Sequence, residues 1–488
     1  MQPSSRRQFL RHSAASAAVF AAPSIRMGRR SSDELRVGVV GVRGRGGSHI
    51  NGFESLEGVQ ITALCDVDSK VLEKSARQLN ERTGRQVATF TDLREMLAKG
   101  DIDIVSIATP NHLHALQTIW SLAAGKDVYV EKPISHSVWE GQQIVAAAAK
   151  YGRIVQTGTQ ARSSSSIRDA IAWLDSGELG EKTHAWGTCF KPRMSIGKVD
   201  GPQPIPSTID WKLYQGPIGE EPLTRGQLHY DWHWQQATGN GDLGNQGIHQ
   251  VDQARWGLGE SDLPPAVLSI GGRFGYDDDG DTPNTVVTFY DYQPAPLIFE
   301  VRGMPHDKAA QADGGSWRKG MDRRLGASIG AMIHAERGYL QLTNNYSTAR
   351  AFDHTGKEIK QWKGSENHFA NFIDAVRKGD ASLIHANVHD GHVSAGLCHM
   401  GNDSLAMGKT ATRDEIERAV ATKPALAHAF DRMMAHLDLN GIDVGSTPLT
   451  FGASLAFDVK SGRYLDNDAA NAYMRGTYAE GFEVPEIS

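Results

Sequence analysis

The chain has 488 residues, about two to three times the usual length of a domain, so we expect at least two domains with cores of their own. A composition of 40% hydrophobic and 22% charged residues excludes disordered and collagen-like proteins. With 51 Lys and Arg against 57 Asp and Glu, the net charge of −6 makes nucleic acid an unlikely class of partner. The three cysteines lie far apart, which disfavours a disulfide framework and a zinc ribbon.

The first 33 residues are predicted to be an export signal and linker. Residues 5–11 read Ser-Arg-Arg-Gln-Phe-Leu-Arg, and a small apolar run follows at 13–22. This pattern resembles a twin-arginine signal, which implies export of a folded chain to the periplasm or another extracytoplasmic compartment. The run is shorter than the roughly 20 apolar residues of a membrane span. We therefore expect cleavage near Ala22 and no stable membrane insertion, with an uncut anchor as the alternative.

Residues 34–158 alternate short apolar runs with segments of helical periodicity. The predicted strands are 35–40, 60–65, 103–108 and 128–130, and the predicted helices are 69–79 and 114–124. Strands joined by helices form right-handed crossovers, so this pattern predicts a doubly wound parallel sheet of the Rossmann type.

A glycine-rich turn follows the first of these strands, with Gly41 and Gly46 at the outer positions and Arg43 and Gly44 between them. Such a turn lets a dinucleotide pyrophosphate approach the backbone and the helix N-terminus behind it. Asp66, just past the next strand, can accept hydrogen bonds from ribose hydroxyl groups and would repel a 2′-phosphate. The pattern favours NAD, while the arginines at 43 and 45 leave NADP as an alternative.

Polar residues also follow the next two strands. The candidates are Thr109, Asn111, His112, Glu131 and Lys132. Because ligands of open α/β sheets bind beyond the carboxyl ends of the strands, we expect these residues to face the nicotinamide half of the cofactor.

After residue 158 the pattern changes to alternating runs separated by Gly, Asp and Pro. The expected strands are 266–274, 285–290, 297–302, 338–342 and 350–353, and the expected helices are 166–176, 367–378 and 388–407. They predict an α+β domain over 159–410 with an open, mostly antiparallel sheet. A C-terminal extension over 411–488 is expected to carry helices at 413–422 and 426–437.

Four motifs occur in order along the chain: the glycine turn, Thr-Pro-Asn-His at 109–112, Glu-Lys-Pro at 131–133 and Gly-Asn-Gln-Gly-Ile-His-Gln-Val-Asp at 244–252. Together they resemble the glucose–fructose oxidoreductase, inositol dehydrogenase and rhizopine-catabolism (Gfo/Idh/MocA) family over about residues 34–405. The resemblance implies a tightly folded Rossmann domain, a nicotinamide cofactor, oxidation of a CH–OH group and oligomer contacts through the C-terminal sheet. It also implies a cis bond before Pro133.

Carried over residue by residue, the resemblance gives Lys132 the role of orienting the substrate oxygen and His249 that of accepting its proton. Burial near a positive nicotinamide should lower the lysine pKa, and an imidazole titrates near neutrality. The family usually has Asp four residues before the histidine, where this chain has Asn245. An amide cannot stabilise an imidazolium by charge, so we expect a weaker base unless Asp252 takes over.

Further substrate contacts are expected from Gln160, Arg162, Trp232, His233 and Asp252. Aromatic rings stack on the apolar faces of sugars, so Trp232 and its neighbours are either one wall of a carbohydrate pocket or core residues. The histidines lack the helix-face spacing of a metal site, and we predict no metal.

Export limits the chemistry, because free nicotinamide cofactors are cytoplasmic and a bound cofactor must then be recycled in place. We predict an enzyme that transfers a hydride between tightly bound NAD and a sugar, glycoside or cyclitol. Two alternatives remain: redox-neutral cleavage or epimerisation of a glycoside through a keto sugar, and a non-catalytic sugar-binding module.

Overall fold

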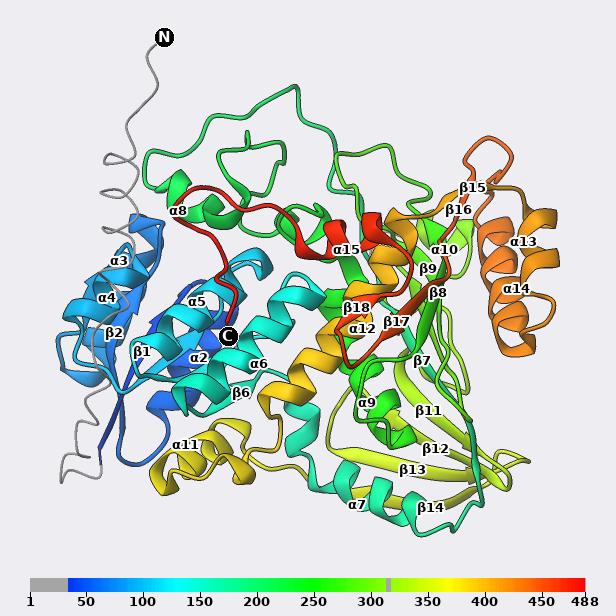
Figure 1. Cartoon of the computed structure of the whole chain (residues 1–488), viewed down its shortest axis with the longest axis horizontal. Coiled ribbons are helices and arrows are strands. Elements are labelled where there is room, and N and C mark those ends of the chain that lie inside the picture. Colours follow the sequence, from blue (N-terminus) through cyan, green and yellow to red (C-terminus); the bar gives the residue numbers. More distant parts are fainter. Residues whose placement is uncertain (1–33, 313–316, 488) are drawn as a thin grey trace.

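The computed structural model describes residues 34–312 and 317–487, and Figure 1 shows the whole chain. The predicted export signal at 1–33 lies outside the described residues. Within them, every helix is too short or too polar to cross a bilayer.

The first sheet consists of six parallel strands in the order β3-β2-β1-β4-β5-β6. Their bounds are β1 Leu35–Val40, β2 Val59–Cys65, β3 Ala88–Phe90, β4 Ile104–Ile107, β5 Asp127–Val130 and β6 Val155–Thr157. The prediction of a Rossmann-type sheet is confirmed. Apolar residues on both faces explain why these strands lack alternation, since helices cover each face.

Helices from both halves of the chain cover this sheet. Those of the N-terminal half are α2 Arg45–Glu54, α3 Ser69–Thr83, α4 Leu93–Lys99, α5 Asn111–Ala123 and α6 Val138–Tyr151. α2 and α3 share one face with α11 (His368–Lys378), which returns from much later in the sequence. α4, α5 and α6 cover the other face, where α12 (Val388–Ala406) packs against α6.

The second sheet is mixed, in the order β14-β13-β12-β11-β7-β10-β9-β8-β16-β15, with β17 on β8. All its pairs are antiparallel except β7 with β10, so the expected open and mostly antiparallel sheet is confirmed. Its main strands are β7 Lys182–Phe190, β8 Ala266–Gly272, β9 Thr285–Tyr290, β10 Leu297–Arg302, β11 Ile329–Ala335, β12 Gly338–Thr343, β13 Thr348–Asp353 and β14 Glu358–Lys363. The short ones are β15 Lys409–Ala411, β16 Leu449–Phe451, β17 Leu455–Asp458 and β18 Arg463–Tyr464.

Helices also lie on this second sheet. α7 (Ser165–Asp175), α9 (Ile248–Leu258) and α12 lie on its inner side. α13 (Arg413–Val420) and α14 (Pro424–Leu439) bury the outer side of β8, β9 and β10, as the orange helices in Figure 1 show. The expected oligomer contact through this sheet stays a prediction, and a partner on the outer face would meet β11–β14.

A long segment and a tail reach from the second domain to the first. The segment 191–242 carries short helices at Trp211–Gln215 (α8), Gly216–Ile218 (η2) and Asp231–Trp234 (η3). After α15 (Asp468–Arg475), the chain runs back past α8 towards α5 and α6, drawn in red in Figure 1. The amide of Ala479 bonds to the carbonyl of Pro217, and the amide of Ile487 bonds to Gln143 of α6.

Candidate functional site

A cavity of about 620 Å³ lies at the carboxyl ends of β1, β2 and β4, where the sequence placed a dinucleotide. Its Rossmann lining includes the predicted residues Gly41, Arg43, Gly44, Asp66 and Thr109. The opposite wall comes from segment 191–242 and the tail, with Tyr214, His229, Tyr230, Trp232, His233 and Phe482. Both domains therefore enclose one elongated space.

The glycine turn has the shape that a pyrophosphate requires. A Cβ at Gly41 would lie 2.8 Å from the carbonyl oxygen of Ala108, and one at Gly46 would lie 1.8 Å from that of Gly41. Gly44, with φ +54°, has nothing within 4 Å of a Cβ and precedes α2 without a side-chain cap. Bare backbone N–H groups at a helix N-terminus, beside open space, are what a phosphate binds.

Asp66 is held in place for a ribose. Its carboxylate accepts hydrogen bonds from the backbone amides of Val42 (2.9 Å) and Asp68 (3.0 Å). Burial raises its pKa, which these bonds oppose. Arg43 and Arg45 are the two residues that keep NADP as an alternative. Arg45 donates a hydrogen bond to Glu131 at 2.7 Å, and Arg43 is exposed at the turn.

Replacing Asp66 by serine is expected to reduce the preference for NAD over NADP by roughly ten-fold or more, because repulsion of a 2′-phosphate disappears with the carboxylate. The measurement is the Kd of each cofactor on protein stripped of nucleotide. Asp169, exposed on α7, provides the matched control D169S, which should leave both constants unchanged. An unaltered ratio in D66S would remove Asp66 from the cofactor site.

Glu131 follows β5 and is buried; it is not among the residues that line the cavity, but it pairs with the lining residue Arg45. Its Oε1 accepts from Arg45 Nε at 2.7 Å and lies 3.0 Å from His49 Nε2. Burial opposes ionisation, yet the charge of Arg45 and the His49 bond hold the pKa of Glu131 well below its usual range. Gln160 approaches the same carboxylate at 3.5 Å. The group is therefore a carboxylate, able to accept from ribose hydroxyls.

Lys132 and the helix of the last motif meet across the domain boundary. Lys132 Nζ donates to the carbonyl of Asn245 at 2.6 Å and lies 3.4 Å from its Oδ1. Asn245 sits in η4 (Leu243–Gly247), a single π-helical turn that leads into α9. Burial lowers the pKa of Lys132 to about 8, and the bond before Pro133 is cis, as the resemblance implies.

His249 is buried at the start of α9, one turn after Asn245. Burial, followed by the charge of Lys132, lowers its pKa to about 3, so the imidazole is neutral. Its Nδ1 is buried without a hydrogen-bond partner among the described residues. A neutral ring with an unused nitrogen close to a lysine can accept a proton from a ligand.

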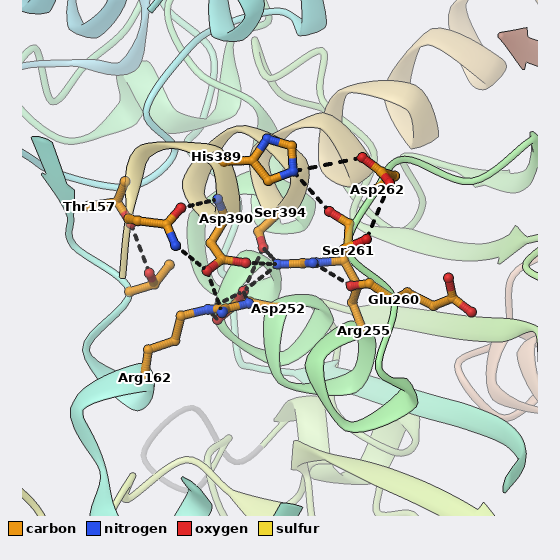
Figure 2. A network of polar contacts seen from close by, with 12 residues as sticks. Thr157, Arg162, Asp252, Arg255, Glu260, Ser261, Asp262, His389, Asp390 and Ser394 are labelled. Atoms are coloured by element: carbon orange, nitrogen blue, oxygen red, sulfur yellow. Dashed lines mark hydrogen bonds and ion pairs between the residues drawn. The ribbon is translucent and has the colours of Figure 1, made fainter. Parts of the chain in front are cut away.

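Asp252 and Arg162 bind each other in a buried network rather than lining the cavity (Figure 2). Arg162 donates to Asp252 at 2.8 and 3.0 Å and pairs with Asp390 at 2.8 Å, while Ser394 donates to Asp252 at 2.6 Å. Arg255 also reaches Asp390 at 3.0 Å. Asp252 thus binds Arg162 and joins α9 to α12, while its charge still acts to raise the pKa of His249 against the lowering by burial and Lys132.

Trp232 and His233 line the cavity, and their contact with a sugar stays a prediction. Their rings stack on each other at 3.6 Å, and His233 Nδ1 lies 2.6 Å from the carbonyl of Tyr230. Burial lowers the pKa of His233 to about 3, with Lys132 contributing, so this wall ends close to the lysine.

Asn111 and His112 are not brought to the cavity lining. Asn111 donates to Asn240 at 3.0 Å, and the two ring nitrogens of His112 lie 2.9 and 3.3 Å from the carbonyls of Tyr214 and Thr238. Both side chains are buried and connect α5 to segment 191–242. They position the wall of the cavity.

Three residues near His249 were not predicted. Lys191, just after β7, donates to Gln246 at 2.6 Å, and Gln246 Nε2 lies 3.5 Å from the Tyr346 hydroxyl. The Tyr346 ring lies 5.4 Å from that of His249. Gln246 belongs to the motif at 244–252, but no sequence pattern connects Lys191 or Tyr346 to that motif. Among the described residues, no group of three His, Cys, Asp or Glu is arranged to hold a metal.

Sequence comparison identifies relatives over about a quarter of the chain. A glycosyl hydrolase family 109 protein of Shewanella sp. strain W3-18-1 is 38% identical over 122 residues, which is 24% of this chain and 27% of that protein. A second such protein, from Shewanella putrefaciens, matches equally. The match spans about a quarter of these relatives.

Solved structures extend the likeness of the fold to both domains. Levoglucosan dehydrogenase in complex with NADH and levoglucosan is 18% identical with a TM-score of 0.57, covering 76% of this chain and 97% of that one. The WlbA dehydrogenase of Bordetella pertussis, in complex with NADH and UDP-GlcNAcA, is 18% identical with a TM-score of 0.55 over the same shares. Residues 35–159 match the family model described as oxidoreductase family, NAD-binding Rossmann fold. Residues 35–159 therefore resemble the NAD-binding Rossmann domain of the Gfo/Idh/MocA oxidoreductases, over about a quarter of the chain.

Proposed function

We propose that the chain is an exported NAD-dependent oxidoreductase that transfers a hydride between a nicotinamide cofactor that stays bound and a sugar, glycoside or cyclitol. The observation that carries the proposal is the meeting of Lys132 with the helix of His249 beside the NAD-binding cavity. The signal-like residues 1–33 support export. The sugar ligands named for the two dehydrogenases of similar fold support the substrate class.

Bound NAD would supply the hydride acceptor, held by the glycine turn and Asp66 and oriented by Glu131. The residues of the chain then handle the proton. Lys132, whose pKa of about 8 leaves it protonated at neutral pH, donates a hydrogen bond to the substrate oxygen. Neutral His249 accepts the hydroxyl proton as the carbon-bound hydrogen leaves. Trp232 and His233 exclude water from that end of the cavity.

Retention of the cofactor is supported by the chain that covers the cavity. Backbone bonds join Ser69 to Thr208 (2.8 Å) and Asp210 to Val67 (2.9 Å), so segment 191–242 is fixed directly beside Asp66. His229 lies 3.0 Å from Asp68, and Phe482 of the tail packs on Trp120. A dinucleotide leaving the cavity must displace these contacts.

Replacing Phe482 by alanine is expected to accelerate release of NAD by on the order of ten-fold, the factor that about 1.4 kcal/mol of lost contact produces. The measurement is the loss of bound nucleotide during a chase with excess unlabelled NAD. Leu465 lies exposed in the same part of the chain, so L465A is the control and should release NAD at the wild-type rate. Equal rates in the two variants would contradict a retaining role for the tail.

The decisive experiment is analysis of protein purified from its native host. Denaturation should release stoichiometric NAD, and adding substrate to the intact protein should reduce it, which near-ultraviolet absorbance detects. A chain that carries no nucleotide and gains none on incubation with NAD would overturn the proposal.

Redox-neutral cleavage of a glycoside through a keto sugar is a second candidate. It is favoured by the glycosyl hydrolase name of the curated relatives, which match 122 residues of this chain. Product analysis separates the two: net oxidation leaves a carbonyl on the sugar and reduced cofactor, whereas cleavage leaves two sugars or a sugar and an alcohol with the cofactor oxidised.

A further inference from the structure

The substrate end of the site contains two ammonium groups that bind neighbouring residues of one helical turn. Lys132 comes from the end of β5 and donates to Asn245, while Lys191 comes from the end of β7 and donates to Gln246, both at 2.6 Å. Both side chains are half-buried. The two ammonium charges also act on each other. Burial has the largest influence on the pKa of Lys132 and lowers it, Glu131 raises it, and the charge of Lys191 lowers it further.

The acidic groups nearby are already committed to other cations. Asp242 forms two bonds of 2.8 Å with Arg193, Glu131 is bound by Arg45 and His49, and Asp252 is bound by Arg162. Within residues 34–312 and 317–487, no carboxylate lies within ion-pair distance of the amine of Lys132 or Lys191. Two like charges in a half-buried site raise its energy unless an anion joins them.

The cofactor does not meet this need. Lys191 is absent from the cavity lining, and the pyrophosphate position at Gly44 and α2 belongs to the opposite, Rossmann side of the cavity. The oxidised nicotinamide is itself a cation, so its arrival adds positive charge. Glu131 and Asp242 act on the two lysines from a distance, and a negative group on the substrate would be the first to bind one of them directly.

We propose that the substrate is an acidic sugar or polyol, whose carboxylate is bound by Lys191 together with the hydroxyl of Tyr346. This inference rests on the proposed function and names the substrate class of that site. An ammonium has three donors and Gln246 uses one, which leaves two for a carboxylate. Lys132 remains available for the reacting oxygen.

The geometry favours a carboxylate over a phosphate. One ammonium and a phenol match one negative charge, whereas a dianionic phosphate is usually bound by guanidinium forks or a helix N-terminus. The guanidinium of Arg193 is committed to Asp242 in the bidentate manner. The exposed Arg318 also contributes to lowering the pKa of Lys191, so the approach from solvent is positive as well.

The test measures binding by calorimetry on the full chain loaded with NAD. The probes are D-glucuronate, D-galacturonate and D-gluconate, each beside its neutral parent sugar or polyol, and glucose 6-phosphate. At least one acid should bind roughly ten- to a hundred-fold more tightly than its neutral partner, and this preference should weaken with salt. K191M should lose the preference while binding the neutral compound as before, and K191R should keep most of it.

Lys198, exposed farther along the same segment and paired with Asp277, gives the control K198M, which should behave as wild type. Bound NAD and the melting temperature report whether K191M is folded, and K191Q replaces it if the methionine variant is not. Tighter binding of glucose 6-phosphate than of every acid, or no acid preference at all, overturns the inference.

Turnover measured on the same samples separates this inference from the proposed function. Oxidation of a neutral sugar without any preference for acids leaves the oxidoreductase standing and removes the role of Lys191. Binding of an acid that depends on Lys191, without reduction of NAD, supports the anion site and counts against net oxidation of that acid.

Discussion

Replacement of Lys132 by methionine is expected to lower kcat by about 10²–10⁴-fold, the usual contribution of a positioned acid or base. The side chain keeps its length and apolar stem, but the ammonium that donates to Asn245 and to the substrate oxygen is lost. Bound NAD should remain near the wild-type amount, because Lys132 is not part of the lining of the cofactor cavity. The loss should therefore appear in turnover rather than in cofactor content.

The pH profile distinguishes a catalytic lysine from a merely structural one. With a pKa of about 8, Lys132 is protonated below that pH, so a rate that needs the ammonium should fall as pH rises through it. K132M should show the residual rate without this alkaline decline. Lys150, exposed on α6, supplies the control K150M. Full turnover in K132M would remove Lys132 from the catalytic machinery.

Replacement of Arg162 by methionine is expected to lower the free energy of unfolding by about 3–5 kcal/mol, the cost of leaving buried partners without their counter-charge. Asp252 is almost wholly buried and would be left with Ser394 and a longer contact to Arg255 at 3.5 Å. The measurement is denaturant unfolding near pH 7. R413M, which removes an exposed pair with Glu417 on α13, should cost about 1 kcal/mol or less.

The deficit of R162M should depend on pH in a defined direction. In the wild type, burial opposes ionisation of Asp252, but Arg162 holds its pKa below the usual value. Without the arginine, the folded-state pKa of Asp252 rises above its unfolded value, so the variant loses stability as pH rises through the acid range. The deficit should be larger near neutral pH than at about pH 4. A loss that is the same at both pH values would assign it to packing alone.

The Rossmann half could be predicted from the sequence because its signals are local. Buried parallel strands are short apolar runs, and each ends at a polar or glycine-rich loop that forms the ligand edge. The strands at 285–290 and 297–302 also coincide with β9 and β10, since turn residues bound them closely. The order of the four motifs along the chain predicted that Lys132, Asn245 and His249 belong to one site.

Other elements lacked such signals. β7 contains Gly187, on which the ring of Phe299 packs, and its apolar and polar residues do not alternate regularly. β14 is a mostly exposed edge strand with polar residues on both faces. Lys191 and Tyr346 reach the site only because β7 and the β12–β13 turn converge on η4, which is a property of the sheet order. The direction of Asp252 was equally unreadable, because its partner Arg162 lies 90 residues earlier.

The hydrogen bond between Lys132 and Asn245 joins the two halves of the molecule at the point where chemistry is expected. Because Lys132 and Asn245 come from different domains, the ammonium keeps its place beside the imidazole-bearing helix only while the two domains stay packed together.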